Sequence, residues 1–269
     1  MKPPIHTDSF TLYPGSGALL VSMPHVGTVI PHELQSRLVE RALQVEDTDW
    51  HLEALYDCVR ASGAGLIVPR YSRYVIDLNR PSENTPMYAG SNNTELCPTR
   101  FFTGEPLYRA GLEPDGAEIA HRVARYWAPY HGALEAELRR LHQTHGRALL
   151  FDAHSIHSEL PWLFEGQLPD LNLGTVDGRS CAPSLRAALA QLLSAQSHFS
   201  QVVDGRFKGG HITRHYGRPS QGWHAVQLEM CWRCYMHEQA PYVLDAERAE
   251  QVRPLLQDLV NSMLAWKPE

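Results

Sequence analysis

The chain has 269 residues, enough for one large domain or two small ones, and its 43% of hydrophobic residues can fill a sizeable core. Its net charge of −6 argues against nucleic acid or an anionic membrane surface as a partner. No apolar run approaches the roughly 20 residues needed to span a bilayer. The five cysteines are scattered and no signal peptide is visible, so we expect a cytoplasmic protein with reduced thiols.

The N-terminal part predicts a strand at residues 19–23 that ends in the motif PHVG, which places His25 at the strand end. An amphipathic helix is expected at 52–59, where apolar residues recur every three or four positions. Two carboxylates precede this helix. Asp47 is a plausible N-cap, which leaves Asp49 free to bind a metal.

Two further strands are predicted at 65–69 and 74–78, and Asn79 and Arg80 follow the second one. A planar guanidinium binds a carboxylate through two parallel hydrogen bonds, so an Asn-Arg pair at a strand end can hold an acidic substrate. The alternative is an arginine that caps a surface turn. Arg73 lies nearby and is a second candidate for anion binding.

Residues 81–116 are rich in Pro, Gly, Asn and Thr and lack periodicity, so they predict a long loop of the kind that often forms lids or binding sites. A helical pattern follows at 117–145, and Pro129 should kink or split it. We interpret its histidines as packing or solvated residues: His121, His131, His142 and His145.

The central stretch RALLFDAHSIHS combines an apolar run at 148–151 with Asp152, His154 and His157. The run is typical of a buried strand in a parallel sheet, and ligands bind at the carboxyl ends of such strands. A carboxylate and imidazoles are costly to bury without partners. A metal ion is one such partner, and ordinary hydrogen bonds are the alternative.

Three elements are expected next, namely a loop at 161–181, a helix at 183–196 and a brief strand at 201–203. A glycine-flanked polar loop is then expected at 209–217. It contains Arg214, a second choice for anion binding ahead of His211 and His215.

Near the C-terminus, the alternating segment 225–230 predicts a strand that carries Glu229. A carboxylate on an apolar strand is expensive unless it has a partner or a function. Cys231 and Cys234 form a CxxC motif, but a single pair is a weak zinc signal. An amphipathic helix at 246–266 ends the chain.

Strands and helices alternate along the chain, which predicts an α/β fold with a mixed, mainly parallel sheet. Two histidines and a carboxylate make a three-ligand zinc site with a position left for water. A further carboxylate, Glu229, could accept the proton of that water and pass it to a leaving amine. These residue types together predict a metal-dependent amide hydrolase.

Six motifs in this order resemble the N-formylglutamate deformylase (N-formylglutamate amidohydrolase) family: SMPHVG, DTDWH, YSRYVIDLNRP, FDAHSIHS, RFKGGHITRHYG and AVQLEM. They span nearly the whole chain. The resemblance implies a single domain over residues 1–269, with a three-layer α/β/α architecture similar to zinc carboxypeptidases and to the aspartoacylase and succinylglutamate desuccinylase group. It also implies hydrolysis of N-formyl-L-glutamate to formate and L-glutamate, a step of histidine degradation.

Carried over by position, the resemblance makes His25 and His154 zinc ligands, and the DTDW motif supplies the carboxylate. We choose Asp49, with Asp47 as the alternative. The related peptidases take their first histidine and a glutamate from one HxxE motif, whereas here Thr28 stands three residues after His25. Zinc is expected, with cobalt, nickel or iron as other candidate metals.

The resemblance also implies that Asn79 and Arg80 bind a substrate carboxylate and that Glu229 is the general base and acid, while zinc-bound water attacks the formyl carbonyl. Arg73 and Arg214 are the further candidates for substrate binding. A deacylase for succinyl or acetyl amino acids is an alternative function. A non-catalytic binding protein for acidic amino acids and a zinc-stabilised structural protein are rivals from other classes.

Overall fold

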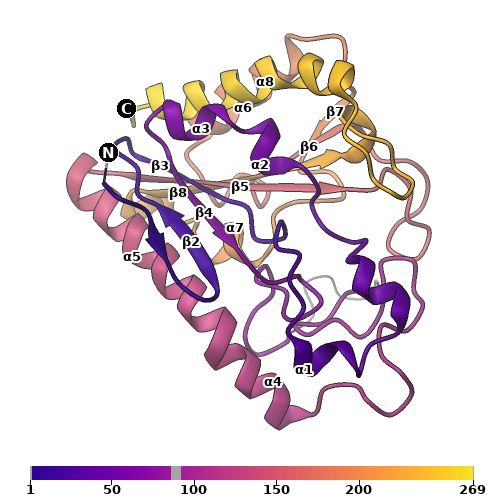
Figure 1. The fold of residues 1–269 in the computed structure, drawn as a ribbon. Coiled ribbons are helices and arrows are strands. Elements are labelled where there is room, and N and C mark those ends of the chain that lie inside the picture. The colour runs from indigo at the N-terminus through magenta and orange to yellow at the C-terminus, as the bar shows by residue number, and fades with distance from the viewer. Residues whose placement is uncertain (1, 86–91, 269) are drawn as a thin grey trace.

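The middle of the molecule is a mixed eight-stranded sheet, shown in Figure 1. The computed structural model describes residues 2–85 and 92–268. The strands are β1 Ile5–His6, β2 Phe10–Tyr13, β3 Leu19–Ser22, β4 Gly65–Pro69, β5 Ala148–Ile156, β6 Leu171–Gly174, β7 Gln201–Val203 and β8 Trp223–Cys231. Their spatial order is β1-β2-β4-β3-β5-β8-β6-β7. Within this sheet, β3–β4, β3–β5, β5–β8 and β6–β7 pair in parallel and the other neighbours are antiparallel, which confirms the predicted mixed sheet.

Helices cover both faces of the sheet (Figure 1). One layer contains α2 Leu52–Leu55, α3 Cys58–Ala61, α6 Pro183–Ser194 and α8 Ala246–Ala265, and the other contains α4 Gly116–Arg122, α5 Ala128–His145 and α7 His211–Tyr216. The remaining short turns of helix are α1 His32–Gln35, η1 Glu40–Gln44, η2 Val123–Trp127, η3 Pro219–Gln221 and η4 Trp232–Cys234. None of the helices in the described part of the chain combines the length and apolar character needed to cross a membrane.

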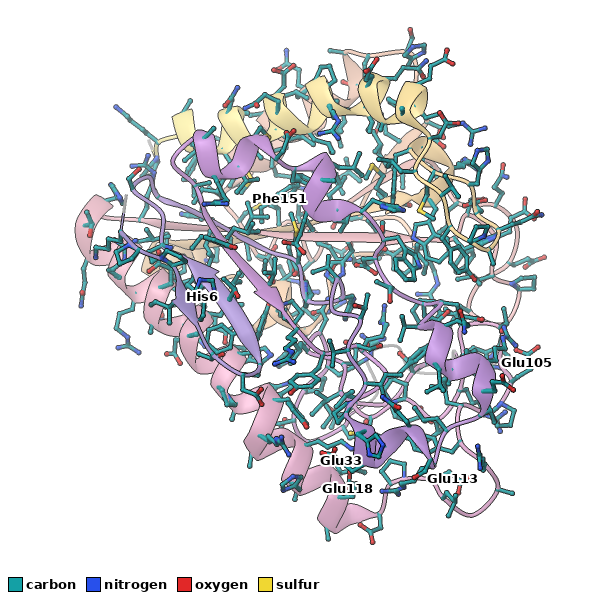
Figure 2. The ribbon with its side chains drawn as sticks, viewed as in Figure 1. His6, Glu33, Glu105, Glu113, Glu118 and Phe151 are labelled. Carbon is teal, nitrogen blue, oxygen red and sulfur yellow. The ribbon has the colours of Figure 1, made fainter. Side chains whose placement is uncertain are left out.

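Side chains of the central strands alternate between the two layers. Leu149 and Phe151 of β5 pack in the core beneath α8, whereas Leu150 packs in the core beside α5. Figure 2 shows Phe151 in the interior and Glu113 at the periphery. Because both faces are covered, the central strands are apolar on both sides, as expected for strands of a parallel sheet.

The segment 74–78, predicted as a strand, is a buried turn instead, so that prediction is wrong. The Asp77 carboxylate accepts the backbone N–H of Asn79 at 2.8 Å, and the N–H of Asp77 donates to the Leu96 carbonyl at 2.7 Å. An aspartate that bonds to the backbone two residues ahead competes with the ladder of a sheet. The apolar pattern of the segment gives no indication of this hydrogen bond.

The predicted polar loop at 209–217 is also wrong, because residues 211–216 form α7. The Oδ1 atom of Asn79 accepts the N–H of Ile212 at 2.8 Å and so satisfies one of the unpaired donors of the first turn. The cap lies 133 residues away along the chain. The expected loop at 161–181 likewise contains β6, which pairs with β8.

Near residue 50, the predicted helix at 52–59 is split into α2 and α3, and Asp47 does not cap it. The N-cap position is His51, which has a left-handed backbone with a φ of 63°. The Asp47 carboxylate instead accepts the N–H of Phe102 at 3.0 Å.

The long helix breaks before Pro129 as predicted, through the π-helical turn η2 between α4 and α5. Proline has no N–H and its ring crowds the preceding turn, which accounts for the altered hydrogen bonding there. The loop predicted at 81–116 has no helix or strand within 81–85 and 92–115, and residues 86–91 lie outside the described part.

His131 of α5 is buried between the rings of Trp127 and Tyr216. Its Nε2 lies 2.8 Å from the Leu78 carbonyl and its Nδ1 lies 3.0 Å from the Tyr216 hydroxyl, the pattern of a neutral imidazole. Burial lowers the pKa of His131 from 6.5 to about 3. Below pH 6.5 the unfolded chain therefore binds a proton here that the folded protein excludes until about pH 3.

Protonation of His131 in the unfolded chain should lower the free energy of unfolding by about 2 kcal/mol as the pH falls from about 7 to about 5. Urea unfolding of the wild type and of His131→Gln at both pH values measures the effect. The variant should be less stable near neutrality but should lose about 2 kcal/mol less on acidification. Equal pH dependence in both proteins would contradict the assignment.

Candidate active site

Three buried side chains from three parts of the chain converge at the carboxyl ends of β3 and β5. His25 lies in the loop after β3, His154 lies near the end of β5, and Asp49 lies before α2. The Nδ1 of His154 is 3.1 Å from the Nδ1 of His25 and 3.2 Å from the Oδ2 of Asp49. The third side of this triangle, from His25 Nδ1 to Asp49 Oδ2, is 3.7 Å.

These separations suit a bound metal ion. Zinc takes nitrogen and oxygen ligands at about 2.0–2.1 Å, so tetrahedral ligand atoms lie roughly 3.3 Å apart. Among the described residues, the side chains whose ligand atoms lie close enough together to share one metal ion are those of His25, Asp49 and His154. The residues present therefore fit a divalent metal.

The far nitrogen of each imidazole faces a carboxylate. The Nε2 of His25 lies 2.7 Å from Asp77 Oδ1, and the Nε2 of His154 lies 3.1 Å from Asp152 Oδ2. A proton on each Nε2 leaves the Nδ1 lone pair directed at Asp49, which is how carboxylates orient metal-binding histidines. Without a proton or a metal cation between the three ligand atoms, the lone pairs of the two Nδ1 atoms and of the Asp49 oxygen would repel one another.

Asp77 and Asp152 were not among the predicted site residues, although Asp152 was noted beside His154 in the central stretch. A signal for Asp152 was available, because it lies two residues before His154 and side chains two apart share one face of a strand. Asp77 had no comparable signal, since it lies in the segment misread as a strand.

Electrostatics at this cluster favour a positive charge. Burial raises the pKa of Asp49, but hydrogen bonds and charge from His154 and His25 outweigh burial and hold it below its usual range. Burial lowers the pKa of His154, yet Asp152 and Asp49 raise it well above its usual value. The carboxylates thus stabilise a cation at the point where the three ligand atoms meet.

Asp47, the alternative ligand, lies outside this cluster. It is buried, its backbone N–H donates to the Tyr74 hydroxyl, and its pKa is raised to about 6 by burial. Asp49 is therefore the carboxylate that the fold brings to the two histidines.

Glu229 lies beside His154 on the neighbouring strand, in register with it. It is buried, and the amide of Gln227 lies 3.3 Å from its Oε2. Burial raises the pKa of Glu229 from 4.5 to about 8. A carboxylate with so high a pKa is a stronger proton acceptor than an exposed one.

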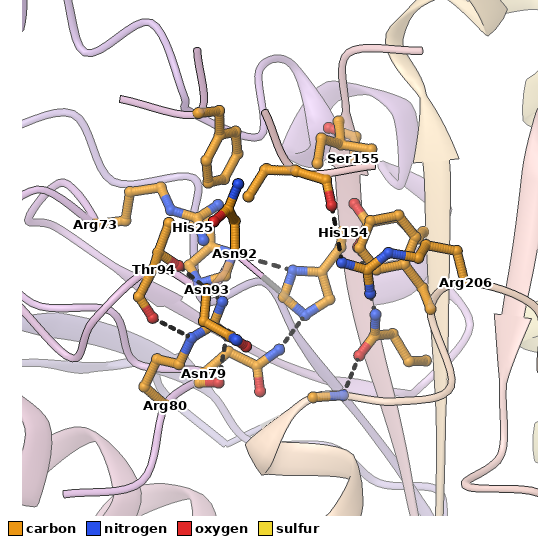
Figure 3. A pocket seen from close by; sticks show the side chains of 17 residues that line it. His25, Arg73, Asn79, Arg80, Asn92, Asn93, Thr94, His154, Ser155 and Arg206 are labelled. Carbon is orange, nitrogen blue, oxygen red and sulfur yellow. Dashed lines mark hydrogen bonds between the residues drawn. The ribbon is translucent and has the colours of Figure 1, made fainter. Parts of the chain in front are cut away.

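Asn79, Arg73 and Arg80 all line the pocket above the cluster (Figure 3). The amide Nδ2 of Asn79 lies 2.9 Å from His154 Nε2, so this residue also packs against a candidate ligand. Arg73 donates to Asp77 at 2.8 Å, and Arg80 donates to Thr94 and to the Asn79 carbonyl.

The remaining candidate residues are not part of the described lining of this pocket. Arg214 of α7 donates to the Gly209 carbonyl at 2.8 Å and does not belong to the described lining of the pocket, and neither do His211 and His215. The thiols of the CxxC motif face the carbonyl oxygens of residues 169 and 170. They form no metal-binding group among the residues described.

One glycine determines how the loop with His25 is placed. A Cβ atom on Gly27 would lie 2.3 Å from the Tyr71 carbonyl oxygen, so only glycine fits between the two loops. Val29 forms a parallel bridge with Tyr71 in the same contact. This close approach brings the loop of His25 beside the turn that carries Asp77.

Comparison with known proteins agrees with this architecture. The family described as N-formylglutamate amidohydrolase matches residues 17–236. N-formylglutamate deformylase of Pseudomonas aeruginosa is 49% identical over 255 residues, 95% of this chain and 96% of the relative. The deformylase of Pseudomonas putida is 46% identical over 259 residues, 96% of this chain and 97% of the relative.

Among solved structures, N-formylglutamate amidohydrolase from Ralstonia eutropha has the same fold, with a TM-score of 0.81 and 23% identity. The superposition covers 96% of this chain and 98% of that one. The family match spans β3 to η4 and includes all three residues of the candidate metal cluster. This chain belongs to the N-formylglutamate amidohydrolase family.

Proposed function

We propose that this protein hydrolyses N-formyl-L-glutamate to formate and L-glutamate, using a divalent metal ion. The observation that carries the proposal is one pocket lined by both histidines of the candidate metal cluster, by the buried carboxylate of Glu229 and by arginines. The first two serve amide hydrolysis, and the arginines suit an acidic substrate. Relatives of nearly equal length that are 46% and 49% identical bear the name N-formylglutamate deformylase.

His25, Asp49 and His154 would hold the metal, and we propose zinc because two imidazoles and one carboxylate suit it. A metal in this position supplies a Lewis acid that polarises the formyl carbonyl and lowers the pKa of water. Asp77 and Asp152 keep the two imidazoles in the tautomer that presents Nδ1.

Glu229 is the proposed general base and acid. Its carboxylate takes a proton from the attacking water as the water oxygen bonds to the formyl carbon, and it then delivers that proton to the amide nitrogen. The C–N bond breaks, and glutamate leaves as the amine. Burial serves this role, because it raises the proton affinity of Glu229.

Arg80 is the proposed ligand of a substrate carboxylate, with Asn79 and Arg73 supporting the same wall of the pocket. Besides lining this wall, Asn79 contacts His154 and accepts the N–H of Ile212 in the first turn of α7. Arg214 was a further candidate from the sequence, and its position outside the described pocket lining favours Arg80.

Formate release from N-formyl-L-glutamate tests the function directly, with and without a chelator and then with zinc restored. We expect release that the chelator abolishes and zinc restores. A deacylase for larger acyl groups would act on the N-acetyl or N-succinyl compound instead. Binding of N-formylglutamate without any turnover at any metal concentration would favour the non-catalytic alternative.

Asp77→Asn should weaken metal binding by about 10- to 100-fold, because the amide orients His25 less strongly than a carboxylate does. The affinity can be measured by competition with a coloured chelator. Arg73 also bonds to Asp77, so unfolding of the variant should be followed in parallel. Unchanged metal affinity in a folded variant would show that Asp77 does not support the metal site.

A further inference from the structure

Arginines stand on two sides of the candidate metal cluster. Figure 3 shows Arg73 and Arg80 on one side of His154 and Arg206 on the other, and all of them line the same pocket. Arg206 follows β7, far from the other two in the sequence. It begins the RFKGGHITRHYG motif, but no role was predicted for it.

Arg73 is already engaged by carboxylates of the protein. Its guanidinium donates to Asp77 at 2.8 Å and lies 3.8 Å from Asp49, and its side chain is only 7% exposed. Its positive charge is therefore largely balanced within the site, and its main effect is to hold these two carboxylates.

Arg80 is held mainly by neutral oxygens. It donates to the carbonyl and hydroxyl oxygens of Thr94 and to the carbonyl of Asn79, and the Asp77 carboxylate lies farther away, at 3.9 Å. These bonds fix the guanidinium in place without neutralising it. A fixed guanidinium loses little freedom when it binds an anion.

Arg206 is fixed by two packed loops. Its guanidinium donates to the Leu163 carbonyl at 3.1 Å, and the ring of Phe207 next to it packs edge-on against Phe164 at 6.1 Å between centroids. The loop after β5 and the loop after β7 thereby place a second guanidinium at the wall of the pocket.

We propose that Arg206 binds one carboxylate of the substrate while Arg80 binds the other, which makes Arg206 a specificity-determining residue for N-acylated dicarboxylic amino acids. This inference rests on the proposed function. In N-formylglutamate the reacting amide is attached to the α-carbon, between the α-carboxylate and the chain that ends in the γ-carboxylate. A reacting group between two anions matches a metal cluster between two guanidinium groups.

The test uses three substrates in the zinc-loaded enzyme: N-formylglutamate, its γ-amide N-formylglutamine, and its α-amide N-formylisoglutamine. We expect Arg206→Gln to lower kcat/KM for N-formylglutamate by about 10- to 100-fold, chiefly through KM. For one of the two amides the same substitution should lower kcat/KM by less than about threefold, because that amide already lacks the carboxylate that Arg206 binds. Arg80→Gln should have its small effect on kcat/KM with the other amide, which lacks the carboxylate that Arg80 binds.

Arg206→Lys retains the charge and should recover part of the loss, and Arg179→Gln removes an arginine that is 70% exposed on the surface, as a matched control for net charge. If Arg206 only supported the loop of Leu163, its loss would lower activity by the same factor on all three substrates, which would overturn the inference. Wild-type activity of Arg206→Gln on N-formylglutamate would also overturn it. A wild-type enzyme that releases no formate would refute the proposed function itself, so the two failures are distinguishable.

Discussion

Glu229→Gln should lower kcat for formate release by about 10²- to 10⁴-fold while the protein keeps its metal. The amide has nearly the same shape as the carboxylate but cannot accept and return a proton. Glu229 is absent from the cluster of candidate ligands, so metal content should stay at the wild-type level. Formate production and metal content, measured on the same sample, check both parts of the prediction.

Glu137→Gln is the matched control, because Glu137 is also a buried glutamate but lies on α5 and bonds to Arg140. It should lower stability and leave kcat within about twofold, as expected for a residue without contact to the reacting groups. If Glu229→Gln retained more than a tenth of the wild-type kcat, Glu229 would not be the proton acceptor, and another group would have to be sought.

Asp49→Asn should reduce metal affinity by more than about 100-fold and abolish activity at zinc concentrations that saturate the wild type. The substitution removes the only negative charge among the three ligand atoms that face one another. Loss of a ligand should exceed the effect of an altered supporting carboxylate, which is about 10- to 100-fold. Isothermal titration with zinc and the formate assay provide the two measurements.

Asp47→Asn makes the same chemical change two residues earlier and separates the two carboxylates that the DTDW motif offers. Asp47 bonds to Phe102 rather than to the histidines, so metal affinity should remain within about threefold of the wild type. Stability at neutral pH can change, because the carboxylate is buried. If Asp47→Asn rather than Asp49→Asn lost the metal, the proposed ligand set would be wrong.

Much of the site could be anticipated from the sequence because its chemistry lies next to recognisable strands. His25, His154 and Glu229 each lie on or just after an apolar run, and strand ends of an α/β sheet meet at one edge. The fold class was predicted from the alternation of strands and helices and the family from the resemblance of six motifs, and the fold and the comparisons confirm both. The catalytic roles of these residues stay predictions.

Errors arose where hydrogen bonds between distant segments override a local pattern. Asn79 caps α7 across 133 residues, so the helix at 211–216 looked like a loop in the sequence. The Asp77 carboxylate accepts the backbone N–H of Asn79 and so turns the chain, and therefore an apolar segment with a strand-like composition does not enter the sheet.

The sequence by itself determines the kinds of groups available, namely imidazoles, carboxylates and guanidiniums at the ends of buried elements. Which of them meet depends on the tertiary structure. His154 contacts Asp49 across 105 residues, and His25 contacts Asp77 across 52. Periodicity reports which face of an element is buried, but contacts over such separations arise only when loops pack, as Gly27 does against Tyr71. The choice of Asp49 over Asp47, the supporting carboxylates and the place of Arg206 beside the cluster all depend on that packing.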